Sequence, residues 1–558
     1  MQNKSFVSIF LGAIKGVCYF PHARFIKSLS SPKDAQTKVF QKLVKSIART
    51  EFGEAHKITG REDYEQFVQK IPVRTYREAE PWIQKQIARR NDRIISPDRI
   101  VHVETTSGST SARKRIPYTN SLISTFSNMF AIWAYDLLST QLQLRTGKIF
   151  ISVSPKSPNT KSSADFTSDD QYLKEPLRSL VSGFLVSPTS KNNWTNFQQD
   201  LALTLMRNPD LEIISIWSPT YLISLMQYVE SHKRELEELL GRDIPTHGHS
   251  RSVDWSRVFP NLQLISCWDS ASAKLSALKL RKKFPGVKIQ GKGLLSTEAP
   301  ITVPLAEAND GCVPLLNDVF FEFEDSQQKV HRLDELTLDC KYEVIVSQMS
   351  GLTRYRTNDI VRVTGFQKST PILDFVARSN ATCDLVGEKL SEEFVRSTLA
   401  PVLRNKKFIL VPRLRETAAY LLLLDAADDA ALRAIECFEK CDQDFRPLDQ
   451  TISDLTDEAL QTSYHYKLAK EQRQLAPVRT LFVDDLNDLF QTFQMQEGIK
   501  FGDIKETYLV TDLDKANRFI QFVSGSLGKT RLQSQSITVQ TDVLAQASSL
   551  LTPIPVGT

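Results

Sequence analysis

This chain of 558 residues has no closely spaced CxxC cysteines, no long apolar run and no large excess of one charge. Its seven cysteines include no CxxC motif, which argues against a disulfide framework and favours a reducing, cytoplasmic compartment. No run reaches the roughly 20 uncharged apolar residues that span a bilayer. The 70 Lys and Arg stand against 65 Asp and Glu, so the charge balance predicts neither a nucleic-acid nor a membrane partner.

What the chain does have is a globular composition, with 41% apolar and 24% charged residues. Its length predicts at least two domains. An apolar stretch at 6–20 follows Lys4, but Lys15 interrupts it and no small-x-small cleavage site comes after it. We therefore expect an N-terminal helix that packs on its own domain rather than a secretory signal.

Hydrophobic periodicity divides the chain into regions of different texture. Residues 31–90 are expected to be helical, with apolar residues at i, i+3, i+4 and i+7 at Phe40, Leu43, Val44 and Ile47. From 100 to 300 strands alternate with helices, which predicts an α/β domain with a largely parallel sheet. The expected strands are 101–104, 148–153, 212–217, 262–267 and 287–290, and a helix is expected at 221–240.

The second half of the chain is richer in short strands. Those expected at 319–323, 342–347 and 360–363 predict a small antiparallel sheet or barrel joined to the α/β body. A polar break at 384–392 then precedes a smaller α+β domain. Its expected elements are strands at 408–411 and 420–424 and a helix at 428–440.

In the segment 105–119, TTSGSTSARKRIPYT, six Ser and Thr hydroxyls surround one glycine, and a run of three cations follows. It follows an expected strand and precedes a helix that begins near Asn120. Such a loop offers clustered donors to a polyphosphate, although a surface loop beside a solvated basic run remains the alternative. The GxxxxGK[ST] spacing is absent, and GKG at 291–293 lacks the third glycine of a dinucleotide fingerprint.

Two later segments add polar groups that suit a nucleotide. GKGLLSTE at 291–298 follows an expected strand, at the end of the sheet where open α/β folds bind ligands. Glu298 there is either a Mg²⁺ ligand, since phosphates can complete the metal's shell, or an exposed loop charge. In GLTRYRTNDIVRVTGF at 351–366, Asp359 suits the ribose hydroxyls, and Tyr355 is either a platform for a base or a half-buried strand tyrosine.

In this order the three segments resemble the nucleotide motifs of adenylate-forming enzymes, TSG[ST]TGxPK, YGxTE and Y[RK]xGD. More specifically, the chain resembles the Gretchen Hagen-type acyl acid amido synthetases, an auxin-responsive and jasmonate-conjugating family of plants that also has bacterial relatives. The likeness extends from about residue 30 to about residue 510. Segments outside the motifs that carry it are 63–83, 114–119, 318–324 and 464–482.

The resemblance implies a domain organisation and a set of site residues. It implies an N-terminal adenylating domain over 1–384 with a β-barrel-like subdomain, a hinge at 385–392, and a small mobile α+β domain over 393–558. The implied phosphate-binding residues are Ser107, Ser109, Thr110, Ser111 and Lys114. Thr297 is implied at the α-phosphate, Glu298 at Mg²⁺, Tyr355 near the nucleotide, and Asp359 and Arg378 at the ribose. Lys505 is implied as a catalytic lysine that moves in for adenylation, and an acyl pocket, or else an ordinary core face, is implied at Phe126, Met129, Trp133 and Trp217.

Several positions depart from the family pattern. Ser111 and Ala112 stand where the phosphate loop has glycine, so the shape of that loop is in question. Asn358 replaces a glycine before Asp359, which we expect the chain to tolerate because Asn adopts left-handed backbone readily. Leu294 takes the place of a tyrosine that contacts adenine. Asp503 and the missing proline after Lys505 depart from the C-terminal motif.

The resemblance implies an ATP- and Mg²⁺-dependent carbon–nitrogen ligase. It would adenylate a carboxylic acid, release pyrophosphate and transfer the acyl group to the amine of an amino acid. The alternatives are an acyl-CoA-type ligase with a thiol acceptor and a nucleotide-binding relative without activity. His247 and His249 form an HxH for which ordinary histidines are the favoured interpretation over a metal site. The acid, the amine and the oligomeric state do not follow from the sequence.

Overall fold

The structure is a computed structural model that describes residues 4–105, 114–151, 173–186, 197–248, 252–309, 311–379, 381–414, 417–426 and 448–533. The described chain forms two compact units. The first runs to Arg378 and includes residues 500–503, and the second holds the rest of the chain from Ser379 onward. This boundary lies upstream of the hinge predicted at 385–392.

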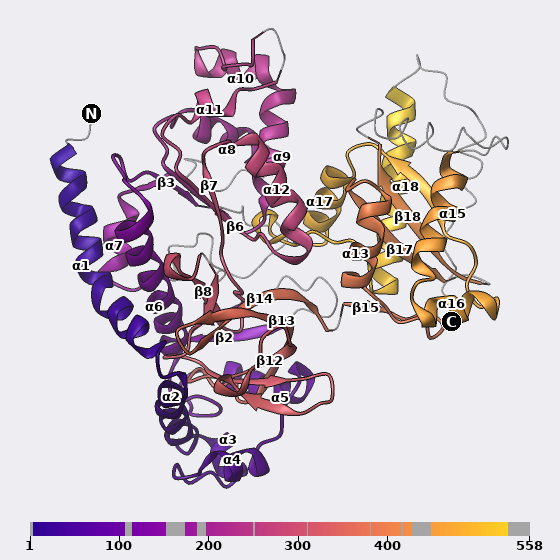
Figure 1. Cartoon of the computed structure of the whole chain (residues 1–558). Coiled ribbons are helices and arrows are strands. Elements are labelled where there is room, and N and C mark those ends of the chain that lie inside the picture. Colours follow the sequence, from indigo (N-terminus) through magenta and orange to yellow (C-terminus); the bar gives the residue numbers. More distant parts are fainter. Residues whose placement is uncertain are drawn as a thin grey trace. The chain divides into compact units, whose positions relative to one another are not determined.

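A five-stranded parallel sheet forms the α/β part of the first unit, as the strand–helix alternation predicts (Figure 1). Its order is β4-β3-β5-β6-β7, and every neighbouring pair is parallel. The strands are β3 (Ile149–Ile151), β4 (Leu185–Val186), β5 (Ile213–Ser215), β6 (Leu264–Cys267) and β7 (Lys288–Gly291). The helices between them are α7 (Leu177–Ser182), α8 (Phe197–Met206), α9 (Pro219–Ser231), α10 (Lys233–Leu240), α11 (Trp255–Val258) and α12 (Lys274–Lys283).

Two sequence predictions in this region were wrong in detail. The strand at 101–104 does not join the parallel sheet: β1 (Ile100–Thr105) pairs antiparallel with β2 (Arg115–Thr119) in a sheet of its own. The expected helix at 221–240 is two helices, α9 and α10, separated at His232, whose backbone leaves helical geometry with a φ of −107° and a ψ of 26°.

A five-stranded antiparallel sheet forms the second part of the first unit and confirms the predicted change of texture. Its order is β11-β10-β12-β13-β14. The strands are β10 (Phe320–Glu324), β11 (Val330–Arg332), β12 (Lys341–Ser347), β13 (Tyr355–Gln367) and β14 (Thr370–Arg378). A separate two-stranded sheet of β8 (Thr302–Pro304) and β9 (Cys312–Pro314) precedes them in the sequence.

Helix α2 (Pro32–Ile47) packs its predicted apolar face into the same core as this sheet. The buried Gln36 amide fixes the contact: its Nε2 donates to the carbonyls of Leu316 and Val319 at 2.8 Å, and its Oε1 accepts from Phe321 N at 2.8 Å. The other helices of this part are α3 (Glu51–Ala55), α4 (Tyr64–Lys70), α5 (Tyr76–Ala88) and α6 (Asn120–Asp136), which a π-helical turn, η1 (Leu137–Gln141), follows.

The N-terminal stretch forms a helix, α1 (Lys4–Ser28), that packs on its own unit as predicted. Val7, Ile14 and Cys18 are buried with Leu177 of α7 and Phe184. None of the helices that the structure describes combines the length and apolar character needed to cross a membrane.

The second unit is a smaller α+β body. In its sheet β17 (Phe408–Leu414) pairs antiparallel with β18 (Ala418–Asp425), and β18 pairs parallel with β19 (Arg479–Val483). The helices are α13 (Glu392–Val402), α15 (Leu448–Leu460), α16 (Tyr464–Glu471), α17 (Leu486–Gln496) and α18 (Leu513–Gln533), and the short strands are β15 (Thr382–Cys383) and β16 (Leu390–Ser391). The helix predicted at 428–440 lies outside the described residues.

Candidate active site

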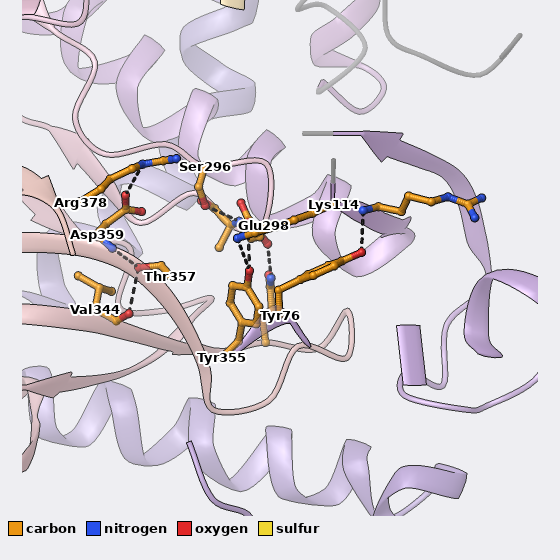
Figure 2. A network of polar contacts seen from close by, with 12 residues as sticks. Tyr76, Lys114, Ser296, Glu298, Val344, Tyr355, Thr357, Asp359 and Arg378 are labelled. Carbon is orange, nitrogen blue, oxygen red and sulfur yellow. Dashed lines mark hydrogen bonds and ion pairs between the residues drawn. The ribbon is translucent and has the colours of Figure 1, made fainter. Parts of the chain in front are cut away.

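Three predicted residues from distant parts of the first unit meet at one point (Figure 2). Lys114 immediately precedes β2, Glu298 lies in the loop after β7, and Tyr355 begins β13. Lys114 Nζ donates to Tyr355 OH at 2.8 Å and to Glu298 Oε1 at 3.2 Å. Tyr355 OH in turn donates to Glu298 Oε1 at 3.1 Å. The three side chains therefore form a closed hydrogen-bonded triangle.

The surroundings of this triangle keep Glu298 ionised and the Tyr355 hydroxyl protonated. Burial alone would raise the pKa of Glu298, but the nearby Lys114 and Arg378 cations bring the pKa below its usual value. Burial and the Glu298 carboxylate raise the pKa of Tyr355 far above its usual range, so its hydroxyl stays protonated. The site thus presents a charged carboxylate and an ammonium that share a neutral phenol.

Asp359 and Arg378 form a second polar pair on neighbouring strands. They are register partners across β13 and β14, and Arg378 Nε lies 3.2 Å from Asp359 Oδ1. Asp359 is 1% exposed, and its backbone N donates to Thr357 Oγ1 at 3.1 Å. Asn358 has a φ of 65°, which confirms the prediction that this asparagine tolerates left-handed backbone.

A tightly bonded turn carries Glu298. Gly293 has a φ of 73°, and a Cβ there would lie 2.6 Å from Thr302 Oγ1, an atom that accepts from Leu294 N at 2.7 Å. Ser296 Oγ accepts from Ala299 N at 3.1 Å, and Tyr118 OH donates to the Thr297 carbonyl at 2.9 Å. These contacts hold the backbone on both sides of Glu298 and leave it little freedom.

The structure places the remaining predicted residues in different surroundings. Phe126 stacks on Tyr118 in a small core cluster, and Met129 belongs to the main core of the unit. Trp133 and Trp217 instead both face Lys292, whose Nζ lies 5.7 Å and 4.8 Å from their ring centroids. Lys505 lies in the second unit. Ser107, Ser109, Thr110 and Ser111 lie outside the described residues.

Two residues at these positions were not predicted from the sequence. The first is Tyr76, whose ring lies 5.6 Å from Lys114 Nζ and whose hydroxyl accepts from Arg115 N at 2.9 Å. A capping box of Thr75 and Glu78 begins α5 at this tyrosine, and that motif was a signal for where the side chain would be fixed. The second is Lys292, whose position between two aromatic rings depends on contacts across the fold.

The HxH motif gains no support as a metal site. His247 Nδ1 lies 3.5 Å from Asp254 Oδ2, and His249 is outside the described residues. Within the part of the chain that the structure describes, no group of three or more His, Cys, Asp or Glu side chains is arranged to hold a metal ion.

Comparison with known families adds a direct match. The model of the GH3 family N-terminal domain matches residues 22–253, and that of the GH3 family central domain matches residues 312–378. The indole-3-acetic acid-amido synthetase GH3.5 of Arabidopsis thaliana is 22% identical over 440 residues, which cover 66% of this chain and 71% of that protein. The jasmonoyl-L-amino acid synthetase JAR4 of Nicotiana attenuata is 22% identical over 442 residues, which cover 68% of this chain and 76% of that protein.

Solved structures show the same fold. The AtGH3.15 acyl acid amido synthetase in complex with 2,4-DB superposes with a TM-score of 0.72 at 19% identity, covering 90% of this chain and 95% of that one. A 2-hydroxyisobutyryl-CoA ligase in the postadenylation state superposes with a TM-score of 0.52 at 12% identity, covering 92% of this chain and 93% of that one.

Proposed function

Because the chain belongs to the GH3 family of acyl acid amido synthetases, within the adenylate-forming superfamily, we propose that Lys114, Glu298 and Tyr355 mark its adenylation centre. The enzyme is a ligase that activates a carboxylic acid as its adenylate and joins it to an amino acid. The hydrogen-bonded triangle of these residues, drawn from three separate segments, is the observation that carries the assignment to this centre.

Two half-reactions follow from that activity. First, a carboxylate oxygen of the acid attacks the α-phosphorus of ATP, the bond to the bridging oxygen breaks, and pyrophosphate leaves. Then the amine attacks the acyl carbonyl, the bond to the AMP oxygen breaks, and the proton of the amine passes to solvent. Both steps depend on positioning and on cations near the phosphates, which is what a fixed Lys114 supplies.

The nucleotide would extend from the triangle to the second polar pair. Asp359 is a buried carboxylate suited to accept from both ribose hydroxyls, and the bond to Arg378 holds it in position. The neutral hydroxyl of Tyr355 and the ring of Tyr76 flank Lys114, so both tyrosines orient the cation that would meet the phosphates. Thr297 lies next to Glu298 in the turn after β7, and we assign it to the α-phosphate.

Glu298 fits the single carboxylate that Mg²⁺ requires when phosphate oxygens supply other ligands. Its lowered pKa keeps it charged beside Lys114 and Tyr355, and it is the residue that would hold the ion. When bound, Mg²⁺ neutralises charge on the phosphates. The residues of this chain position those phosphates and hold the carboxylate that anchors the ion.

We assign Lys505 and the segment 385–392 to movement of the second unit. Gly387 has a φ of 100°, and the buried Glu388 carboxylate accepts from Leu385 N at 2.9 Å and from Val386 N at 2.8 Å. These bonds make the segment a compact turn just after the boundary of the units, and it is there that we place the pivot of the movement. Lys505 would then serve adenylation only.

Acceptor-dependent AMP release tests the function. The protein is incubated with ATP, Mg²⁺ and aryl, indolyl, jasmonate-like or aliphatic acids, and then with each of twenty amino acids or with CoA. We expect at least one acid to support ATP–pyrophosphate exchange and amino acids to accelerate AMP release. Acceleration by CoA alone would assign the thiol-dependent reaction instead. Exchange by no acid, with ATP still bound, would assign a relative without activity.

A further inference from the structure

An apolar cavity of about 120 Å³ lies within the first unit, between α1, α6 and α7 and the strands β3 to β5. Its walls are mainly Leu, Ile and Phe side chains, including Leu11 and Ile14 of α1. Trp133 of α6 and Ser215 at the end of β5 also line it. The wall of the cavity is thus apolar except where Trp133 and Ser215 bring an indole and a hydroxyl to it.

Both of these wall residues contact the same buried cation. Lys292 is 7% exposed, and its Nζ donates to Ser215 Oγ at 2.7 Å. The same Nζ lies over the rings of Trp133 and Trp217. Trp133 is held in turn, because its Nε1 donates to Gln290 Oε1 at 2.9 Å. Aromatic faces attract cations, so Trp133 and Trp217 hold the Lys292 ammonium at the edge of the cavity.

Lys292 also lies close in sequence to the adenylation centre. It directly follows β7, and its backbone N donates to the Cys267 carbonyl at the end of β6 at 3.1 Å. The turn from Gly293 to Thr302 leads from it to Glu298. A group bound to this ammonium would therefore lie at the carboxyl ends of the parallel strands, where such sheets bind their ligands.

We propose that Lys292 binds the carboxylate of the acid substrate while the cavity takes the substrate's uncharged tail. This inference rests on the proposed function and names its substrate class. A cavity of about 150 Å³ accommodates benzene, so the present one suits a tail of roughly five or six carbons or a single ring. The expected substrates are monocarboxylic acids with a small apolar body, such as hexanoate or benzoate, and the charged head excludes neutral analogues.

The first test compares Lys292→Met, which keeps the length and removes the charge, with Lys283→Met on the exposed end of α12 as the matched control. Hexanoate and 1-hexanol are titrated into each protein without ATP, and tryptophan fluorescence reports binding beside Trp133 and Trp217. We expect Lys292→Met to weaken hexanoate binding roughly 30-fold, which corresponds to about 2 kcal/mol, because a buried charge partner is lost. Hexanol should bind wild type and both variants alike.

The outcomes separate this proposal from the function on which it rests. Equal hexanoate affinity in wild type and Lys292→Met would overturn the role of Lys292, whether or not the enzyme is active. Equal loss of hexanol and hexanoate binding would show that the lysine only supports the cavity, and would also overturn it. Wild type that binds hexanoate through Lys292 but shows no exchange with any acid would contradict the proposed function and leave the binding site in place.

The second test concerns the tail. Leu138 lines the cavity and is only partly buried, so Leu138→Phe can fill space with little strain on the core. Exchange is measured with a series of straight-chain acids from four to twelve carbons. We expect an optimum near six carbons in wild type and a shift to shorter acids in the variant. An optimum at ten carbons or more, or one that does not move in Leu138→Phe, would overturn the assignment of the cavity.

Discussion

Among the single residues, adenylation depends most on one carboxylate that is buried and yet charged. Glu298 is 7% exposed, and Lys114 supplies the nearest cation. We predict that Glu298→Gln lowers the rate of ATP–pyrophosphate exchange by about 10²–10³-fold, because a charged contact to the reacting phosphates is lost. The exposed Glu307→Gln is the control and should keep the wild-type rate. Unchanged exchange in Glu298→Gln at saturating Mg²⁺ would remove this residue from the site.

The lowered pKa of the same carboxylate predicts a pH dependence of stability. A group whose pKa is lower in the folded state stabilises the protein above its unfolded pKa, here 4.5, and loses this contribution as the pH falls through the folded value. The difference in free energy of unfolding between wild type and Glu298→Gln should therefore stay constant from pH 8 to about 5 and shrink in more acid solution. Urea unfolding at a series of pH values measures it. A difference that grows on acidification would contradict the cited direction of the shift.

At the scale of elements, the turn after β7 decides where Glu298 lies. Gly293 and Gly286 both have positive φ, 73° and 84°, but only at Gly293 would an added Cβ meet a neighbour, Thr302 Oγ1. We predict that Gly293→Ala and Gly286→Ala each lose about 1–2 kcal/mol from the strained backbone. Only Gly293→Ala should also displace the turn and reduce exchange, by tenfold or more at matched folded fraction. Equal exchange in the two variants would show that the turn tolerates the displacement.

Elements also show how far the sequence leads. The apolar face of α2, the strands β3, β5, β6 and β7 and the left-handed Asn358 could be predicted, since each depends on periodicity or on local backbone preference. The two-residue strand β4 was not predicted. β2 was missed because its five residues lie directly against a basic run and contain a proline. The break at His232 was missed because it falls inside an otherwise regular apolar pattern.

The site was predictable in part for the same reason. Glu298, Tyr355 and Asp359 lie in motifs whose order along the chain is informative. Tyr76 belongs to none of these motifs, and Lys292 lies in GKGLLSTE without a type or spacing that singles it out. Their contacts appear only when α5 and β7 are placed beside other elements. Phe126 and Met129 lie in core clusters, and the sequence leaves open whether they line an acyl pocket, because apolar side chains at helical spacing fit a core as well as a pocket.

At the scale of the whole molecule, we propose a division of labour between the two units. If Lys505 serves adenylation, Lys505→Ala should slow ATP–pyrophosphate exchange by about 10²-fold or more, since a cation aimed at developing charge is lost. Aminolysis of a supplied acyl-adenylate should change little. Both rates are measured on the full chain, with thermal unfolding as the check on folding. A parallel fall in both would assign the lysine to folding or docking of its unit instead.

Oxygen labelling shows whether the acid passes through an acyl-adenylate. The enzyme is given an acid with ¹⁸O in both carboxylate oxygens, together with ATP, Mg²⁺ and an amino acid, and the products are weighed by mass spectrometry. Because a carboxylate oxygen attacks the α-phosphorus and leaves with it, the account predicts one ¹⁸O in AMP and one in the amide. Label that enters inorganic phosphate, or AMP that carries none, would contradict it.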